Sequence, residues 1–276
     1  MKLPSLLCFA LGALVSPSCS PEAKASQVLV LTGSSTVAPL AAEIALRYEQ
    51  QHPGVRIDVQ SGGSSRGIAD VRLGHADLGM ASRELVESEM DLTAHTIARD
   101  GVALIVHRDN DLAGLSSDQV RSIFRGEVTN WSDVGGSGGE IIVVNKAEGR
   151  ATLTVFLEHF GLGPREIAAD VIVGENEQAI KTIAGAPGAI AYVSIGTAEV
   201  DQAAGVPVRR VILDGVPAAS EEVALGLYPL VRPLNLLTTG EVPELAAAFI
   251  AFARHADQGD LVLAESFVPV SNTAGE

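Results

Sequence analysis

Residues 28–39 read VLVLTGSSTVAP, in which an apolar run and Thr32 are followed by glycine and three hydroxyl residues. A continuous apolar run bounded by glycine is typical of a strand that is buried on both faces of a parallel sheet. After it, Leu40, Ile44 and Tyr48 recur every four residues and predict a helix, in whose first turn Pro39 is tolerated. The stretch therefore predicts a strand, a tight turn and a helix.

The same unit recurs along the chain. Further strands are predicted at the apolar or alternating runs 55–59, 102–106, 141–144 and 189–193. Two of these strands lead into turns that resemble the first one, GGSSRG at 62–67 and EGRAT at 148–152. Repeated alternation of strand and helix predicts an α/β fold with mainly parallel sheets and helices on both faces.

The start of the chain has the pattern of an export signal. Lys2 precedes an apolar run at 6–15, and small residues follow up to Ala25. The run is too short for a transmembrane helix, which takes roughly 20 residues. We expect cleavage after Ala25; the alternative is processing at Cys19, which would leave a lipid anchor. Because Cys8 and Cys19 both precede Ala25, the protein cleaved there has no disulfide.

Composition excludes several classes of protein. Hydrophobic residues make up 47% of the chain, enough for one large or two medium cores, so disorder is excluded. The formal charge of -15 argues against nucleic acid, which needs clustered Lys and Arg. It also means that a bound anion must be held by local donors. The six histidines are dispersed without metal-ligand spacing, and we expect neither a metal nor a cofactor.

The three hydroxyl- and glycine-rich turns are the candidate binding elements. Each is expected to lead into a helix, and helix N-termini carry unpaired N–H groups and the positive end of the dipole. Serine and threonine hydroxyls add further donors. Three such ends that face one cleft would surround an anion. The alternative is that each turn is an N-cap and nothing more.

Two arginines add charge to these turns. Arg83 ends the ASR motif at 81–83, and Arg150 lies in the third turn. A guanidinium fork matches two oxygens of a tetrahedral anion in a charge-assisted geometry. The alternative for Arg83 is a surface ion pair with Glu84 or Glu87.

Six motifs in a fixed order carry a family resemblance. They are GSSTVAP at 33–39, GSSRGI at 63–68, ASR at 81–83, DGVA at 100–103, IFRG at 123–126 with Asn130-Trp131, and YPLVRPL at 228–234. This order resembles the phosphate-binding proteins of bacterial ABC importers, which are type II periplasmic binding proteins. The resemblance covers nearly all of the chain after residue 25 and implies two α/β lobes that close on an anion.

The resemblance also implies a division of the chain and a site. After the signal peptide at 1–25, residues 26–104 and 225–276 would form lobe 1 and residues 105–224 lobe 2. The turn residues at 107–110 and the proline-containing stretch 228–234 are places in the sequence where the chain could cross between lobes. The implied anion contacts are Ser35, Thr36, Ser64, Ser65, Arg83, Gly149, Arg150, Ala151 and Thr152. Inorganic phosphate would be the ligand, ABC transporter permease subunits the partners, and the periplasm or cell envelope the location of a monomer.

Two departures from the family pattern bear on specificity. The third turn usually reads GSGT, whereas Arg150 replaces the serine in this chain. Better-known members place an aspartate where Arg83 stands, and that carboxylate accepts the proton of hydrogen phosphate. Glu148 or Asp70 could take over this task. Another tetrahedral oxyanion, sulfate or molybdate, is therefore the alternative ligand.

Two other functions fit parts of the sequence. GSSRG at 63–67 matches the nucleophile elbow of serine hydrolases, with Ser65 as the nucleophile. That fold needs several strands upstream of the elbow, whereas only one strand-helix unit precedes Ser65 after the leader. An envelope scaffold that keeps the fold without transport is the other alternative. We expect a binding protein and no enzyme.

Overall fold

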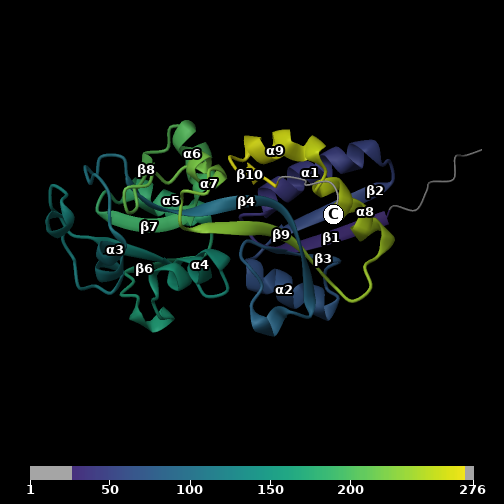
Figure 1. Ribbon diagram of the computed structural model, residues 1–276, viewed down its shortest axis with the longest axis horizontal. Helices are drawn as coiled ribbons and strands as arrows, with labels where there is room; N and C mark the ends of the chain where they lie inside the picture. The colour runs from purple at the N-terminus through teal and green to yellow at the C-terminus, as the bar shows by residue number, and fades with distance from the viewer. Residues whose placement is uncertain (1–26, 271–276) are drawn as a thin grey trace, which may run out of the picture.

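The computed structural model describes residues 27–270, so the predicted leader and Cys19 lie outside the described residues. Two lobes lie side by side along the long axis (Figure 1). Lobe 1 contains β1 (Gln27–Gly33), α1 (Ala38–Gln51), β2 (Val55–Ser61), α2 (Ser64–Leu73), β3 (Leu78–Ala81), α8 (Glu244–Ala253), α9 (Gly259–Ala264) and β10 (Val268–Pro269). Lobe 2 contains α3 (Ser117–Phe124), β5 (Ile142–Lys146), α4 (Ala151–Phe160), β6 (Val171–Val173), α5 (Asn176–Gly185), β7 (Ala189–Ser194), α6 (Ile195–Ala203), β8 (Val208–Arg210) and α7 (Ser220–Ala224).

Two long strands, β4 (Leu92–His107) and β9 (Val231–Thr239), join the lobes (Figure 1). Within lobe 1, β1 pairs in parallel with β2 and β3, and within lobe 2, β5 pairs in parallel with β6 and β7. The pairs that involve β4 or β9 are antiparallel. The parallel α/β units that the sequence predicts are thus present in each lobe, and two strands of opposite direction connect them.

The first crossing differs from its expected position. Strand β4 pairs with β9 as far as Gly101 and with β7 from Val102 onward, so the chain passes between the lobes inside a continuous strand. The turn at 107–110, which we expected to cross, follows the end of β4 in lobe 2. The reason is that the apolar run 102–106 continues a longer strand in which polar and apolar residues are mixed.

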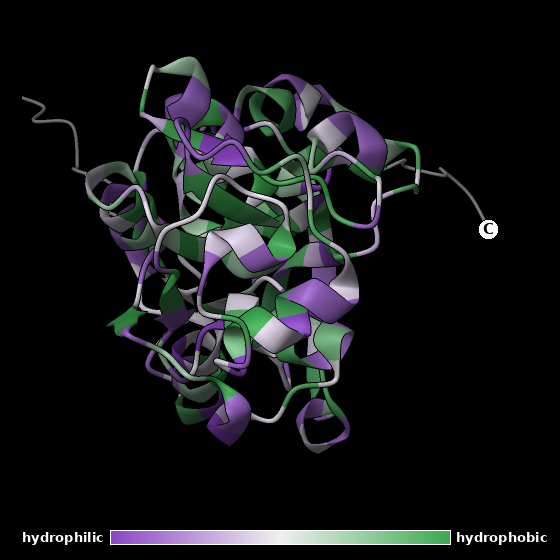
Figure 2. Cartoon of the chain, turned by 90° about the vertical axis from the view of Figure 1, so that its left-hand side faces the viewer, coloured by the Kyte–Doolittle hydropathy of each residue, from purple (hydrophilic) through white to green (hydrophobic). Residues whose placement is uncertain are grey.

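Each lobe has its own hydrophobic core. In lobe 1, Leu40, Ile44 and Tyr48 of α1 are buried in one cluster with residues of β1 and β2, which confirms the helix predicted from their spacing. In lobe 2, Phe156 of α4 stacks on Tyr192 of β7, with ring centroids 4.0 Å apart. Viewed along the long axis, hydrophobic strands lie at the centre of the molecule, and the helices that surround them carry many hydrophilic residues (Figure 2). Packing in these cores fixes the positions of the helices in each lobe, including those whose first turns face the other lobe.

Helix α2 lies unusually close to the sheet of lobe 1. A Cβ atom on Gly67 would lie 2.6 Å from the carbonyl oxygen of Thr32 and 2.8 Å from that of Met80. Real Cβ atoms do not approach this closely, so only glycine allows α2 to pack directly on β1 and β3. The N-terminus of α2 is thereby held beside the ends of these strands. Over residues 27–270, no helix is both long and apolar enough to span a membrane.

Candidate functional site

A small cavity lies between the lobes. It is lined by Ser34, Ser35, Thr36, Gly63, Ser64, Ser82, Arg150, Ala151, Thr152, Gly174 and Asn176. All of these residues follow the carboxyl ends of strands, namely β1, β2 and β3 in lobe 1 and β5 and β6 in lobe 2. Ligands of α/β proteins bind at this edge, where loops rather than strands supply the contacts.

Four helices begin at this cavity. Their first residues or caps are Val37 for α1, Gly63 for α2, Arg150 for α4 and Glu175 for α5. The first N–H groups of a helix have no carbonyl partner within the helix, and the dipole places partial positive charge there. Convergence of these ends makes the cavity attractive to an anion despite the overall charge of -15.

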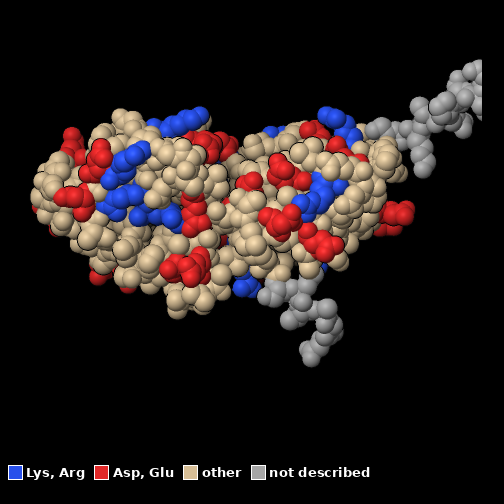
Figure 3. All heavy atoms as spheres, turned by 90° about the horizontal axis from the view of Figure 1, so that it is seen from above, with Lys and Arg blue, Asp and Glu red and all other residues tan. Residues whose placement is uncertain are grey.

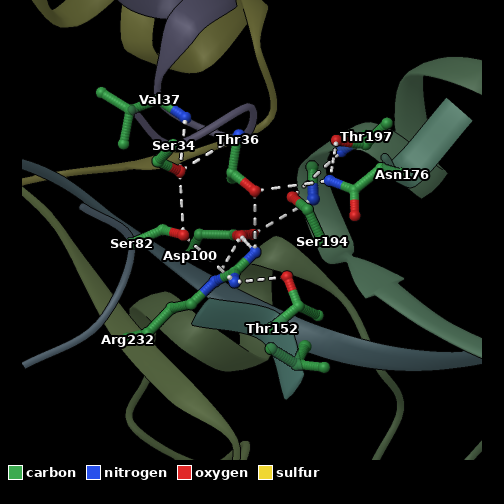
Figure 4. A network of polar contacts seen from close by, with 12 residues as sticks. Ser34, Thr36, Val37, Ser82, Asp100, Thr152, Asn176, Ser194, Thr197 and Arg232 are labelled. Carbon is green, nitrogen blue, oxygen red and sulfur yellow. Dashed lines mark hydrogen bonds and ion pairs between the residues drawn. The ribbon is translucent and has the colours of Figure 1, made fainter. Parts of the chain in front are cut away.

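Arg232 of β9 lies behind the cavity and contacts both lobes (Figure 4). Only 1% of its surface is exposed, and its Nη2 lies 2.8 Å from Oδ2 of Asp100 on β4. The guanidinium donates to Oγ1 of Thr36, 3.2 Å away in lobe 1, and to Oγ1 of Thr152, 2.9 Å away in lobe 2. Burial of this ion pair is tolerable because its hydrogen bonds are satisfied.

The hydrogen bonds determine which way the hydroxyl groups point. Thr36 and Thr152 each accept from Arg232, and Oγ of Ser64 accepts from the backbone N–H of Ser82 at 3.2 Å. A hydroxyl that accepts in this way still has its own O–H to donate. These O–H groups line a buried cavity, where an unpaired donor is costly. An oxyanion would accept from all three.

Arg150 is held at the cavity wall by a carboxylate. Its Nη1 lies 2.6 Å from Oε1 of Glu175, the residue that caps α5. The pair joins the starts of α4 and α5, and it fixes the guanidinium at the cavity wall. Since Arg232 and Arg150 are each paired with one carboxylate, the cavity attracts an anion mainly through oriented dipoles and hydroxyls.

The structure brings together most of the site residues expected from the sequence. Those that line the cavity are Ser35, Thr36, Ser64, Arg150, Ala151 and Thr152. Ser65 and Gly149 lie at its rim, where the backbone N–H of Ser65 donates to the carbonyl oxygen of Gly149 at 3.2 Å. This bond runs from lobe 1 to lobe 2 and holds the cavity closed.

Arg83 is the expected contact that the structure places elsewhere. Its guanidinium forms two hydrogen bonds, of 2.7 and 2.8 Å, with the carboxylate of Glu89 and does not line the cavity. These bonds are the main reason why the pKa of Glu89 lies below its ordinary value. The fork that would hold an anion is occupied by a carboxylate six residues along the chain, so we correct the expectation and leave Arg83 out of the site.

Sequence reasoning missed two important side chains, Arg232 and Asn176. Arg232 is a lone charge within the apolar run 228–234, and the sequence predicts only a crossing there. Asn176 follows Gly174 after the short strand β6, so it belongs to a fourth turn of the same kind as the other three. Glu148 is exposed and Asp70 pairs with Arg66, so neither of the proposed proton acceptors lines the cavity.

The acidic side chains of the outer surface leave the attraction of an anion to the local donors of the cavity. Figure 3 shows two rounded halves with a narrower waist, and acidic side chains are spread over both halves. The described residues contain no group of three or more His, Cys, Asp or Glu side chains placed to hold a metal ion.

Comparison with known proteins agrees with this geometry. Residues 20–255 match the family described as PBP superfamily domain. The phosphate-binding protein PstS of Bacillus subtilis is 30% identical over 263 residues, which are 93% of this chain and 85% of that protein. A phosphate ABC transporter substrate-binding protein with bound phosphate, from Clostridium perfringens, superposes with a TM-score of 0.83 at 30% identity, over 89% of this chain and all of the other.

A second solved structure gives the same result. An ABC-type phosphate transport receptor from Vibrio cholerae superposes with a TM-score of 0.73 at 30% identity, over 88% of this chain and 100% of that one. Fold and sequence agree, and the chain belongs to the PBP superfamily, in the family of the phosphate-binding proteins.

Proposed function

We propose that this protein binds inorganic phosphate in the interlobe cavity and delivers it to an ABC importer. The observation that carries the proposal is the set of hydroxyls on Thr36, Ser64 and Thr152, each of which accepts a bond and retains an O–H to donate. Together with four helix N-termini, they surround the small cavity between the lobes, and donors of this kind attract an anion. The names of the relatives, which are phosphate-binding proteins, support phosphate as the ligand.

The choice between phosphate and other tetrahedral oxyanions is a finer question. Hydroxyls and backbone N–H groups donate to phosphate, arsenate, sulfate and molybdate alike. The cavity lining among the described residues includes no carboxylate that could accept the proton of hydrogen phosphate. We therefore propose phosphate as the physiological ligand on the basis of the family, and sulfate or molybdate as the alternative.

The cellular setting is part of the same proposal. The export pattern before Ala25 and the phosphate-transport relatives support action outside the cytoplasm, in the periplasm or on the envelope. The partners would be permease subunits that recognise the closed, liganded monomer. The two separate cores support two lobes, close to the expected lobe 1 of residues 26–104 and 225–276 and lobe 2 of residues 105–224. Val102, Leu104, Tyr228 and Leu230 pack in the core of lobe 2, so the crossings lie a few residues from these bounds.

The serine hydrolase alternative is not supported by the geometry. Ser65 is exposed at the rim of the cavity, and its backbone N–H is bonded to the other lobe. The described lining of the cavity contains no histidine to serve as a base. Turnover of an activated ester that is lost in Ser65→Ala would overturn the binding proposal.

Calorimetry of the protein lacking residues 1–25 tests the proposal. Phosphate should bind with 1:1 stoichiometry, and sulfate and molybdate titrations should define selectivity. Thr152→Val should weaken phosphate binding by about 1.5 to 3 kcal/mol, because it removes a donor to a charged ligand. The control is Thr154→Val on the same helix, since Thr154 does not line the cavity and its loss should leave affinity unchanged. Equal affinities in both variants would contradict this site.

A further inference from the structure

A lysine is buried behind the wall of the cavity. Lys146 ends β5, and only 3% of its surface is exposed. Its Nζ donates to the carbonyl oxygen of Glu175 at 2.8 Å and to Oδ1 of Asn176 at 3.2 Å. Lys146 does not line the cavity itself. Both of its acceptors belong to the start of α5, where Asn176 lines the cavity. Burial of a charged amine costs free energy of folding, which suggests that Lys146 has a role at this position.

The amine determines the orientation of the Asn176 side chain. A protonated lysine can only donate, so it requires the amide oxygen of Asn176 on its own side. The NH2 group then points the opposite way, where Nδ2 donates to Oγ1 of Thr36 at 3.4 Å and to Oγ1 of Thr197 at 3.3 Å (Figure 4). Thr36 belongs to lobe 1, so this amide spans the two lobes at the cavity.

We propose that Lys146 is a positioning residue that, when protonated, holds the NH2 group of Asn176 toward the cavity and thereby couples anion binding to the uptake of a proton. A neutral amine can accept as well as donate, so it no longer fixes the amide orientation. The proposal rests on the proposed function, because it concerns the anion that this cavity would hold.

The charges around Lys146 set the range of pH in which this coupling operates. Burial is the main cause that lowers its pKa from 10.5 to about 7. Arg232 and Arg150 lower it further, whereas Glu175 and Glu177 raise it. The nearby hydroxyl of Tyr192 accepts from the backbone N–H of Lys146, and burial raises the pKa of this tyrosine. Charged and neutral forms of Lys146 therefore coexist near neutral pH.

The sign of the coupling follows from these pKa values. An anion in the cavity stabilises the charged amine and raises the pKa of Lys146. Near and above pH 7, binding therefore takes up a proton at this residue, and affinity falls as pH rises. Below the pKa the amine is already charged, so no proton is taken up there and affinity levels off.

Calorimetric titrations with inorganic phosphate measure this proton directly. Binding is followed from pH 6 to 8.5 in two buffers with different heats of ionisation, for the wild type, Lys146→Met and Lys146→Arg. Protonation changes of phosphate itself contribute equally to all three proteins, so differences between them belong to residue 146. The control is Lys181→Met, since Lys181 is an exposed lysine on α5, the helix whose first turn Lys146 contacts.

The wild type and the Lys181 control should take up more protons above pH 7 than either Lys146 variant. Lys146→Met should bind about tenfold more weakly at pH 6.5, the scale of one lost bond to a charged group. Lys146→Arg, with a permanent charge, should keep its affinity at pH 8.5 better than the wild type. Equal proton uptake in wild type and Lys146→Arg would overturn the inference. A wild type that binds no phosphate at any pH would instead overturn the proposed function.

Discussion

Arg232 is the residue at which the two lobes and the cavity meet. Its guanidinium bonds Thr36 from lobe 1, Thr152 from lobe 2 and Asp100 from the neighbouring crossing strand. Asp100 and Arg232 are directly paired in the antiparallel register of β4 and β9, so the ion pair sits where the chain crosses. A buried charge at this point links the orientation of the hydroxyls to the position of both lobes.

Removal of this charge should affect stability and binding separately. Arg232→Met leaves Asp100 as an unpaired buried carboxylate, and we expect a loss of about 3 to 5 kcal/mol in the free energy of unfolding. Arg232→Met combined with Asp100→Asn removes both charges and should recover part of that loss, as urea unfolding would show. Phosphate affinity should stay low in both variants, because the hydroxyls of Thr36 and Thr152 lose the donor that orients them. Full recovery of affinity in the double variant would contradict this role.

The residues of the site were predictable only where they belong to local motifs. Thr36, Ser64 and Thr152 lie in turns between a strand and a helix, and this local pattern is visible in the sequence. The role of Arg232 was not predictable, because it depends on a partner brought by folding. Arg83 forms an ion pair, as its alternative predicted, but with Glu89 in place of Glu84 or Glu87 and in a buried position. Glu89 occupies the guanidinium of Arg83, whereas Asp100, 132 residues before Arg232, allows that arginine to be buried at the cavity.

At the scale of elements, the site depends on how closely the helices approach the sheet. The start of α2 supplies Gly63 and Ser64 to the cavity. Glycines in β1, α2 and β3, which lie next to one another, allow α2 to pack this closely on the sheet. A Cβ on Gly67 would lie 2.9 Å from Cα of Gly33, and one on Gly79 would lie 2.7 Å from the carbonyl oxygen of Gly67. Backbone rather than flexible side chains fills this space, so a methyl group cannot be accommodated by a rotamer change.

Gly67→Ala should therefore push α2 away from β1 and β3. We expect a loss of about 1 to 3 kcal/mol in the free energy of unfolding, the usual cost of overpacking, and weaker phosphate binding. The matched control is Gly185→Ala in α5, where no atom lies within 4 Å of the added Cβ. That change should leave stability equal or higher, because alanine favours the helix. Denaturant unfolding of both variants makes the comparison, and equal stability in the two would refute the packing argument.

Elements with a long regular pattern were predictable, and those without one were not. Helix α1 is several turns long, so the four-residue spacing of its apolar residues is visible in the sequence. The apolar run of β1 is long enough to be recognised as a buried strand. Strand β6 has only three residues, which is too short for a period, and the turn after it that carries Asn176 was missed. The crossing inside β4 was missed because a change of strand partner leaves no local mark in the sequence.

At the scale of the whole molecule, the closed cavity is held by contacts made between the lobes. Asn176 bonds Thr36, and the N–H of Ser65 bonds the carbonyl oxygen of Gly149 at the rim. A ligand that enters this cavity has to wait for these contacts to break and can leave only in the same way. Hinge motion about β4 and β9 is the movement that such two-lobed proteins use.

A reversible crosslink at the rim should test this closure. A Cβ on Gly149 would lie 3.5 Å from Cβ of Ser65, within the range of about 3.5 to 4.5 Å found in disulfides. The φ of +81° at Gly149 makes a cysteine there cost about 1 to 3 kcal/mol. In the variant Ser65→Cys with Gly149→Cys, oxidation in the presence of labelled phosphate should slow its release at least tenfold, and reductant should restore release. Small-angle scattering of the oxidised form should give the same radius of gyration with and without phosphate. Since the reduced protein carries the same substitutions, equal release before and after reduction would show that phosphate leaves without separation of the lobes.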